Sequence, residues 1–361
     1  MKTRIPAFIA LCIALASCET NTGNSPAQIS GDIYVLNNGN FGDSNSNIAV
    51  YDTENHEIAA DAFFNANGIS LGDTGQDIMI AGEEIYIAVF GSKCIFVTDN
   101  SLKIKKNLTI CSEDGTRLSP RQFCKGDGKI YVTLYEGFAA EINPSEGYSI
   151  RLASVGRNPE GIAYAGGKLY IANSGGMDYP NYDNTVSVVD ADSFRETERI
   201  TVNTNPASVA ANSDGSLIFV SSLGDYSTMT PGMLQAVSTA TGQVTDIGYE
   251  NISGISMGPE NRLYVLTAGY DEKWNQLPGT IFIQDASSTS FTGVKFVTDG
   301  TVLEKAYSIS ATPDGYVFVG ISDYKTNGDI FVFNSDGRLL DRFDSEGMNP
   351  QKAVKQQIFS K

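Results

Sequence analysis

The side chains best suited to binding chemistry in this chain are aromatic rings and amides set in polar segments. Tyr and Trp give large rigid contact areas at low entropic cost, and amides hydrogen-bond to polar, uncharged groups. The pattern predicts binding of a polar organic molecule, although we expect about half of the rings only to pin loops. The candidate binding residues are Phe41, Phe90, Arg121, Tyr135, Arg157, Asn158, Tyr179, Tyr182, Asn205, Tyr226, Tyr270, Trp274, Tyr324 and Asn349.

Signals for catalysis are sparse. The single histidine, His56, falls in a predicted outer hairpin, away from any nucleophile. Carboxylates on inner strands can hold a divalent ion, but only Asp77 and Glu160 are obvious there, and two carboxylates make a thin calcium shell. A loop trio, Asp178, Asn181 and Asp183, is the alternative calcium site. We therefore predict no catalytic residue, no metal and no cofactor, with a calcium-dependent lactonase or hydrolase as the less favoured reading.

The elements that must position these residues recur along the chain. An aromatic β pattern returns seven times, and its third positions lie 39 to 54 residues apart. A period of this length with only β signals inside it indicates a β-propeller. The aligned positions are Tyr34, Tyr86, Tyr131, Tyr170, Ile218, Tyr264 and Phe318.

Each repeat reads as four short antiparallel strands. Residues 158–202 show it best, because strand patterns at 160–165, 168–172, 185–189 and 198–202 are separated by turn residues. The first repeat begins at its second strand, 32–36, whereas residues 351–357 follow an Asn-Pro pair with no partner after them. We predict an all-β, seven-bladed propeller closed by this C-terminal strand in the first blade. The alternative is a frayed polar tail.

Long loops gather on one side of this layout. In an antiparallel blade, the loop after strand two and the segment before strand one share a face, and nearly all the long loops follow second strands. Binding groups concentrate on loops held by a rigid scaffold. The candidate rings lie in these loops, and the arginines and asparagines above are expected around the axial mouth beneath them.

The N-terminus is typical of an export signal: Lys2 and Arg4 precede an apolar run that is too short to span a membrane. Leu15-Ala-Ser-Cys18 resembles the bacterial lipobox, in which the cysteine is lipidated. The predicted organisation is a lipoprotein signal peptide (1–17), a flexible tether (18–30) and the propeller (31–361). An ordinary signal peptide is the alternative. The resemblance implies an exported, lipid-anchored protein, which we place at the outer membrane, facing the cell surface.

The net charge and the cysteines limit the possible partners and cross-links. A net charge of -17 with dispersed Lys and Arg argues against a nucleic-acid partner, which requires a basic footprint. Cys94 and Cys111 fall opposite each other if a hairpin is centred between residues 102 and 103, and an exported protein can oxidise such a pair. A Cys94–Cys111 disulfide is thus a possible cross-link.

Two segments resemble surface lipoproteins of Bacteroides-type bacteria: Lys168 to Gly176 with its continuation Tyr179 to Asp190, and Tyr34 to Gly42. These lipoproteins belong to the YncE-like, seven-bladed propeller group, and the chain looks most similar to the BtuG-type proteins. The resemblance covers the repeat layout of the mature chain, but its sharp motifs fall in only two blades. The loops at Phe90 and Tyr135 are shorter than the others. If the loops together form a cup around the axial mouth, its wall is lower on this side.

This resemblance implies a non-enzymatic protein that captures cobalamin (vitamin B12) or another corrinoid and passes it to a TonB-dependent transporter of the BtuB type. A corrin is broad, apolar on its faces and fringed with amides, so a wide cup of aromatics and asparagines suits it. The resemblance places it over the axial mouth, against Tyr179, Tyr182, Tyr226, Tyr270 and Trp274. A glycan- or peptide-binding propeller is the alternative, because such loops stack sugars equally well.

Overall fold

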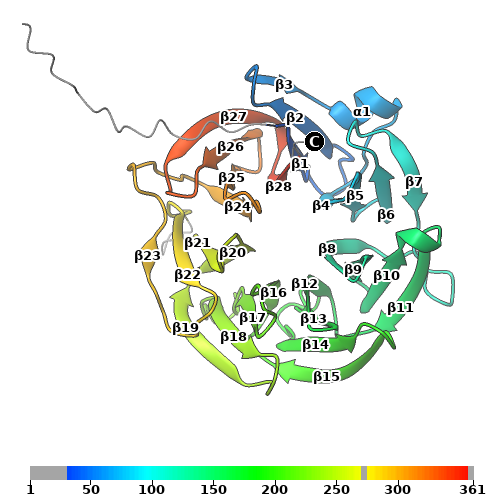
Figure 1. Cartoon of the computed structure of the whole chain (residues 1–361), viewed down its shortest axis with the longest axis vertical. Coiled ribbons are helices and arrows are strands. Elements are labelled where there is room, and N and C mark those ends of the chain that lie inside the picture. Colours follow the sequence, from blue (N-terminus) through cyan, green and yellow to red (C-terminus); the bar gives the residue numbers. More distant parts are fainter. Residues whose placement is uncertain (1–30, 270–274, 357–361) are drawn as a thin grey trace, which may run out of the picture.

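The computed structural model describes residues 31–269 and 275–356. Within these ranges the strands form seven four-stranded antiparallel sheets, which stand as blades around a central axis (Figure 1). Each blade has its first strand nearest the axis and its fourth strand at the rim. The predicted all-β, seven-bladed propeller is confirmed.

The first four blades follow in chain order, each given from the axis outward. Blade 1 comprises β28 (Pro350–Lys355), β1 (Ile33–Asn37), β2 (Asn47–Asp52) and β3 (Glu57–Ala59). Blade 2 comprises β4 (Gly75–Ala81), β5 (Glu84–Val89), β6 (Cys94–Thr98) and β7 (Ile104–Leu108). Blade 3 comprises β8 (Pro120–Gly126), β9 (Lys129–Leu134), β10 (Phe138–Asn143) and β11 (Ser149–Ser154). Blade 4 comprises β12 (Pro159–Ala165), β13 (Lys168–Asn173), β14 (Thr185–Asp190) and β15 (Arg195–Thr201).

The last three blades complete the ring. Blade 5 comprises β16 (Pro206–Ala211), β17 (Leu217–Ser222), β18 (Met233–Ser238) and β19 (Val244–Glu250). Blade 6 comprises β20 (Ile252–Met257), β21 (Arg262–Thr267), β22 (Thr280–Asp285) and the short β23 (Val294–Lys295). Blade 7 comprises β24 (Ala306–Ala311), β25 (Val317–Ile321), β26 (Asn327–Phe333) and β27 (Leu339–Met348). Helix α1 (Ala62–Asn67) and the 3-10 turn η1 (Pro144–Glu146) lie in connections.

The two ends of the chain close the ring in blade 1. β28 pairs with β1 in an antiparallel ladder that sets Ile33 opposite Lys355 and Val35 opposite Ala353. The pairing gives β1 a neighbour on both sides, so neither of its edges is left open to association. The predicted closure by the C-terminal strand is confirmed.

The repeated second strands form the core because each lies inside its blade and packs against the blades on either side. All five residues of β1 are buried, and the aromatic third positions Tyr86, Tyr131 and Tyr264 are at most 1% exposed. Contacts run from blade to blade: Tyr34 and Leu36 of blade 1 pack with Ile85 of blade 2. This explains why the second strands read as short, nearly continuous apolar runs.

The predicted disulfide is wrong. β6 pairs with β7 so that Ile95 faces Leu108, and a register shift between Val97 and Thr98 displaces the hairpin from the expected centre. Cys111 therefore lies past the end of β7, where it makes an isolated bridge with Arg117. The described cysteines Cys94, Cys111 and Cys124 are all free thiols. Across the same described ranges, we find no helix with the length and apolarity needed to cross a membrane.

Candidate ligand-binding face

One face of the ring, here called the loop face, carries the loops after the second strands and the segments before the inner strands. In every blade the first residue of the loop donates its N–H to the carbonyl of the residue just before the inner strand. Ser174 donates to Asn158 at 3.2 Å, Leu223 to Asn205 at 2.8 Å and Asn38 to Asn349 at 2.9 Å. These seven equivalent bonds anchor each loop at its base.

The anchoring residue before the inner strand is commonly an asparagine for a conformational reason. Asn158, Asn205, Asn251 and Asn349 have φ values of 45°, 61°, 55° and 58°, in the left-handed region that asparagine tolerates better than most residues. The Asn-Pro pairs of the sequence are therefore turn elements that start an inner strand.

The predicted side chains among them, those of Asn158, Asn205 and Asn349, lie mainly against other parts of the protein. Asn349 is 4% exposed and bonds within the protein, donating to the Gly39 carbonyl at 2.8 Å and accepting from Ser322 at 2.6 Å. Asn205 is 5% exposed. Asn158 is half-buried and donates to the Tyr135 carbonyl at 3.1 Å. The ligand contacts of Asn205 and Asn349 stay a prediction: both side chains are nearly buried, and both polar atoms of the Asn349 amide already bond within the protein.

A second regularity places side chains at the axial mouth. Every inner strand carries one extra residue near its start, a β-bulge relative to its partner strand. Bulges re-aim side chains and recur near functional sites. In each inner strand the second residue lies in this bulge. We call these seven residues the bulge ring; in blade order they are Gln351, Gln76, Arg121, Glu160, Ala207, Ser253 and Tyr307.

Hydrogen bonds join bulge-ring residues of neighbouring blades. Arg121 donates through Nη1 to the Gln76 amide oxygen at 2.8 Å and through Nε to the Glu160 carboxylate at 2.7 Å. On the other side, the Tyr307 hydroxyl donates to the Gln351 amide oxygen at 3.0 Å. These contacts cross from blade to blade, so the side chains meet around the axis rather than lying along their own sheets.

Arg121 also supports two of the predicted rings. Its guanidinium carbon lies 5.1 Å from the centre of the Phe90 ring and 4.8 Å from that of Tyr135, within cation–π range. Burial raises the pKa of Glu160, and the neighbouring Arg121 opposes that rise. Burial and Glu160 raise the pKa of the Tyr135 hydroxyl to about 12, so this hydroxyl is neutral at physiological pH.

The predicted aromatic residues gather into three groups above the bulge ring. Phe41, Phe90 and Tyr135 form a chain with centroid distances of 6.4 and 5.4 Å. Tyr324 packs against Tyr307 at 5.6 Å, edge to face. The third group comprises Tyr179, Tyr182 and Tyr226, with centroids 6.0 and 6.3 Å apart.

Several of these rings remain open to solvent even after packing. Phe41 is 76% exposed, Tyr179 62%, Tyr324 54% and Tyr226 51%, and Met177, on the same loop as Tyr179, is 75% exposed. Large apolar side chains gathered on one face of a soluble protein mark a contact surface. The expectation that long loops would carry rings together on this face agrees with the geometry.

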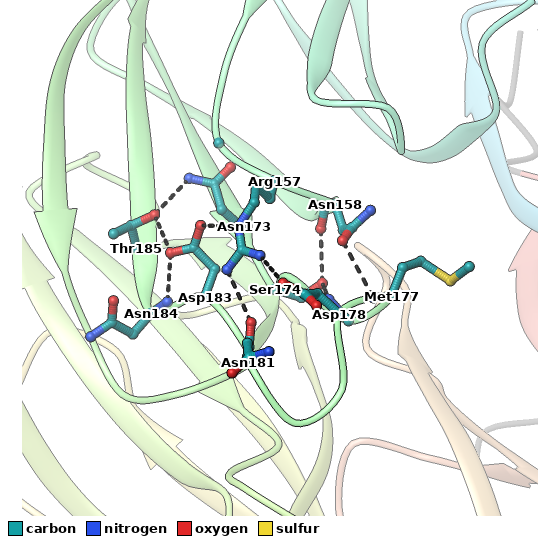
Figure 2. A network of polar contacts seen from close by, with 12 residues as sticks. Arg157, Asn158, Asn173, Ser174, Met177, Asp178, Asn181, Asp183, Asn184 and Thr185 are labelled. Carbon is teal, nitrogen blue, oxygen red and sulfur yellow. Dashed lines mark hydrogen bonds and ion pairs between the residues drawn. The ribbon is translucent and has the colours of Figure 1, made fainter.

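Arg157 braces the loop that carries Tyr179 and Tyr182 (Figure 2). Its guanidinium pairs with Asp178 at 2.7 Å, approaches Asp183 at 3.7 Å and donates to the Asn181 carbonyl at 3.0 Å. The same three residues were the alternative calcium trio. Because the guanidinium lies among them, it supplies the positive charge that a metal ion would bring. Arg157 thus holds a loop.

Other predicted residues have different positions. Tyr270, Trp274 and Cys18 lie outside the described residues. His56 lies in the outer turn of blade 1, next to Tyr51 at 2.9 Å. Asp77 is a link between inner strands, accepting from Lys352 at 2.7 Å and from the Phe123 N–H at 2.7 Å. Among residues 31–269 and 275–356, no group of three or more His, Cys, Asp or Glu side chains is placed to hold a metal ion.

Sequence reasoning missed Gln76, Tyr307 and Gln351. A positional signal existed for Gln351, since Arg121, Glu160 and Gln351 each directly follow a proline that begins an inner strand. A hollow of about 720 Å³ lies elsewhere, between the turns at Glu260–Arg262 and Ser335–Asp336. Charges of both signs line it, and none of the grouped rings reaches it. The loop face is the better candidate because its rings and its amides converge.

Comparison with known structures supports the fold. The chain is similar to hydrazine synthase of Kuenenia stuttgartiensis, at 14% identity and a TM-score of 0.60 over 77% of this chain and 88% of that one. Dihydro-heme d1 dehydrogenase NirN in complex with DHE aligns at 10% identity and 0.56, over 92% and 77%. The computationally designed Ika8 protein aligns at 12% and 0.55, over 90% of both chains. At such identities the likeness concerns the fold alone.

No curated protein matches the sequence. A family model described as a domain of unknown function, DUF5074, matches residues 31–246, which is more than half of the chain and runs from β1 to the start of β19. The chain therefore belongs to the DUF5074 family.

Proposed function

We propose that this protein is a non-enzymatic receptor that captures cobalamin or another corrinoid on its loop face. The proposal rests on two layers of side chains on this face. Exposed rings lie on the loops, and the amide, guanidinium and hydroxyl groups of the bulge ring lie beneath them. A corrin has apolar faces and an amide-rich edge. The rings supply area for the faces, and the polar layer supplies partners for the edge.

The resemblance of the 168–190 and 34–42 segments to BtuG-type lipoproteins supports the same ligand class. Both segments lead into the loop face, in blades 4 and 1. We further propose that the protein is anchored through Cys18 at the outer membrane, facing the cell surface, and delivers its ligand to a TonB-dependent transporter of the BtuB type.

Gel filtration with cyanocobalamin tests the binding proposal. Protein beginning at Gly31 is incubated with the coloured ligand at micromolar concentrations, and absorbance in the visible range is followed through the protein peak. The proposal expects co-elution at one ligand per chain. Absence of colour, together with binding of oligosaccharides or peptides in parallel titrations, assigns the face to the glycan- or peptide-binding class instead.

Replacing rings locates the site. Phe90→Ala and Tyr135→Ala each remove one partly buried ring of a packed group, and each is expected to weaken binding about tenfold, as for loss of one aromatic contact. Phe291→Ala is the matched control, because this ring is 56% exposed on the outer part of blade 6, packed against Tyr249. Equal losses in all three variants contradict a site on the loop face.

A further inference from the structure

The composition of the bulge ring differs around the axis. Five consecutive blades, from blade 7 through blade 4, carry long polar residues: Tyr307, Gln351, Gln76, Arg121 and Glu160. The two remaining blades, 5 and 6, carry Ala207 and Ser253. Hydrogen-bonding side chains therefore extend into the axial mouth from blades 7 and 1 to 4. Blades 5 and 6 contribute only short side chains; we call this part of the mouth the low side.

The polar side has an unequal supply of donors and acceptors. The Gln76 amide oxygen accepts from Arg121 and the Gln351 amide oxygen accepts from Tyr307, so both oxygens are used inside the ring. The amide nitrogens of Gln76 and Gln351 make no hydrogen bond within the described residues. Gln76 is 7% exposed, yet its amide nitrogen is not fully buried, so this N–H can reach a ligand at the mouth. The two amide nitrogens are therefore donors that remain available to an acceptor at the mouth.

Charge in the ring favours a neutral ligand. Arg121 is the one cation of the ring, and Glu160 neutralises it through a paired contact in which both side chains are largely buried. The polar side therefore offers two amide N–H donors from adjacent blades, beside an ion pair with no net charge. Such a site matches carbonyl oxygens better than carboxylates or phosphates.

The low side leaves room next to exposed rings. Ala207 has no side-chain atom beyond Cβ, and Ser253 donates back to the Leu266 carbonyl of its own blade at 3.3 Å. Neither reaches across the axis. Tyr226, on the loop of blade 5, is 51% exposed and contacts Tyr182 of blade 4. The body of a ligand can thus lie over blades 5 and 6 while its edge turns toward blades 1 and 2.

Resting on the proposed function, we infer that the bulge ring orients the ligand. Gln76 and Gln351 donate to carbonyl oxygens on one edge of it, and Ala207 and Ser253 provide the space for its bulk. The ligand class is an uncharged molecule with several peripheral carboxamides. Gln76 and Gln351 are then specificity-determining residues, whereas the exposed rings supply contact area.

The substitutions Gln76→Glu and Gln351→Glu test the donors. A glutamate keeps an oxygen for Arg121 or Tyr307 and keeps the shape, but it has no N–H to offer and repels a carbonyl oxygen. Each is expected to weaken cyanocobalamin binding about tenfold or more by isothermal titration, the effect of losing one hydrogen bond to a buried group. Gln243→Glu is the matched control: Gln243 lies in the turn between β18 and β19, on the opposite face.

Steric filling tests the low side. Ala207→Phe and Ser253→Phe are expected to abolish binding, whereas Ala207→Ser and Ser253→Ala leave it within about threefold. Melting temperatures equal to that of the wild type show that each variant is folded. If the wild type binds but the glutamate or phenylalanine variants bind equally well, the inference is overturned. If the wild type itself binds no cyanocobalamin, it is the proposed function that fails.

Discussion

Removal of β28 is expected to unfold the protein rather than shorten it. A chain ending at Asn349 loses five paired positions with β1, from Asn37–Pro350 to Ile33–Lys355. At about 1 kcal/mol net for each hydrogen bond, the ladder alone is worth a few kcal/mol. The deletion also uncovers β1, whose residues Ile33 and Val35 are both fully buried.

An uncompensated charge adds to this loss. Lys352 pairs with Asp77 at 2.7 Å, and the Asp77 side chain is 5% exposed. Because the Lys352 side chain is 33% exposed, its loss costs less than the about 3–5 kcal/mol of a fully buried pair. Together with the ladder and the uncovered apolar area, the deletion matches the whole stability of a typical protein, about 5–15 kcal/mol.

Differential scanning calorimetry and gel filtration measure the result. The chain ending at Asn349 should show no cooperative transition and should elute as aggregate, because β1 becomes an open, apolar sheet edge. A chain ending at Gln356 is the matched control and should melt like the full protein. If the shorter chain stays monomeric and melts within a few degrees of the control, closure through β28 does not hold the ring together.

Three further outcomes are expected. Arg157→Ala should leave the melting temperature within a few degrees, because its side chain is half exposed, while speeding hydrogen exchange in the 174–184 loop and weakening cyanocobalamin binding. Burial raises the pKa of Tyr34 and of Tyr135 from 10.0 to about 12. The stabilisation from keeping these hydroxyls neutral is complete below about pH 10 and is lost as the pH rises toward 12, so urea unfolding at pH 11 should give a lower free energy than at pH 8; equal values contradict the assignment. Protein beginning at Gly31 should show three reactive thiols per chain with a thiol reagent in denaturant, without prior reduction. A count of one thiol would mean that two of the cysteines form a disulfide after all.

The fold could be predicted because each repeat shows its strands and turns within a short stretch of sequence. The apolar third positions are buried inside the blades, where Tyr86 packs against Phe123 and Tyr264 against Phe296. The missing inner strand of the first repeat and the unpaired strand at the C-terminus pointed to each other. Both are inferences about periodicity, which a single sequence displays.

The site was less accessible to such inference, because it depends on backbone irregularities. A one-residue bulge decides which side chain faces the axis, so Gln76 and Tyr307 look like ordinary strand residues in the sequence. A similar shift in the β6–β7 hairpin moved Cys111 away from Cys94. The Asn-Pro pairs are visible in the sequence, but the turn that each supports, such as that of Asn349, is a backbone feature.

Hydrogen exchange with and without cyanocobalamin tests the central claim most directly, since it reports which amides the ligand covers. Protection is predicted in the loops after the second strands, including those that carry Phe90, Tyr135 and Tyr182, with the hairpin turns of the opposite face unchanged. Protection confined to those opposite turns or to the outer strands, with none on the loop face, would contradict the account.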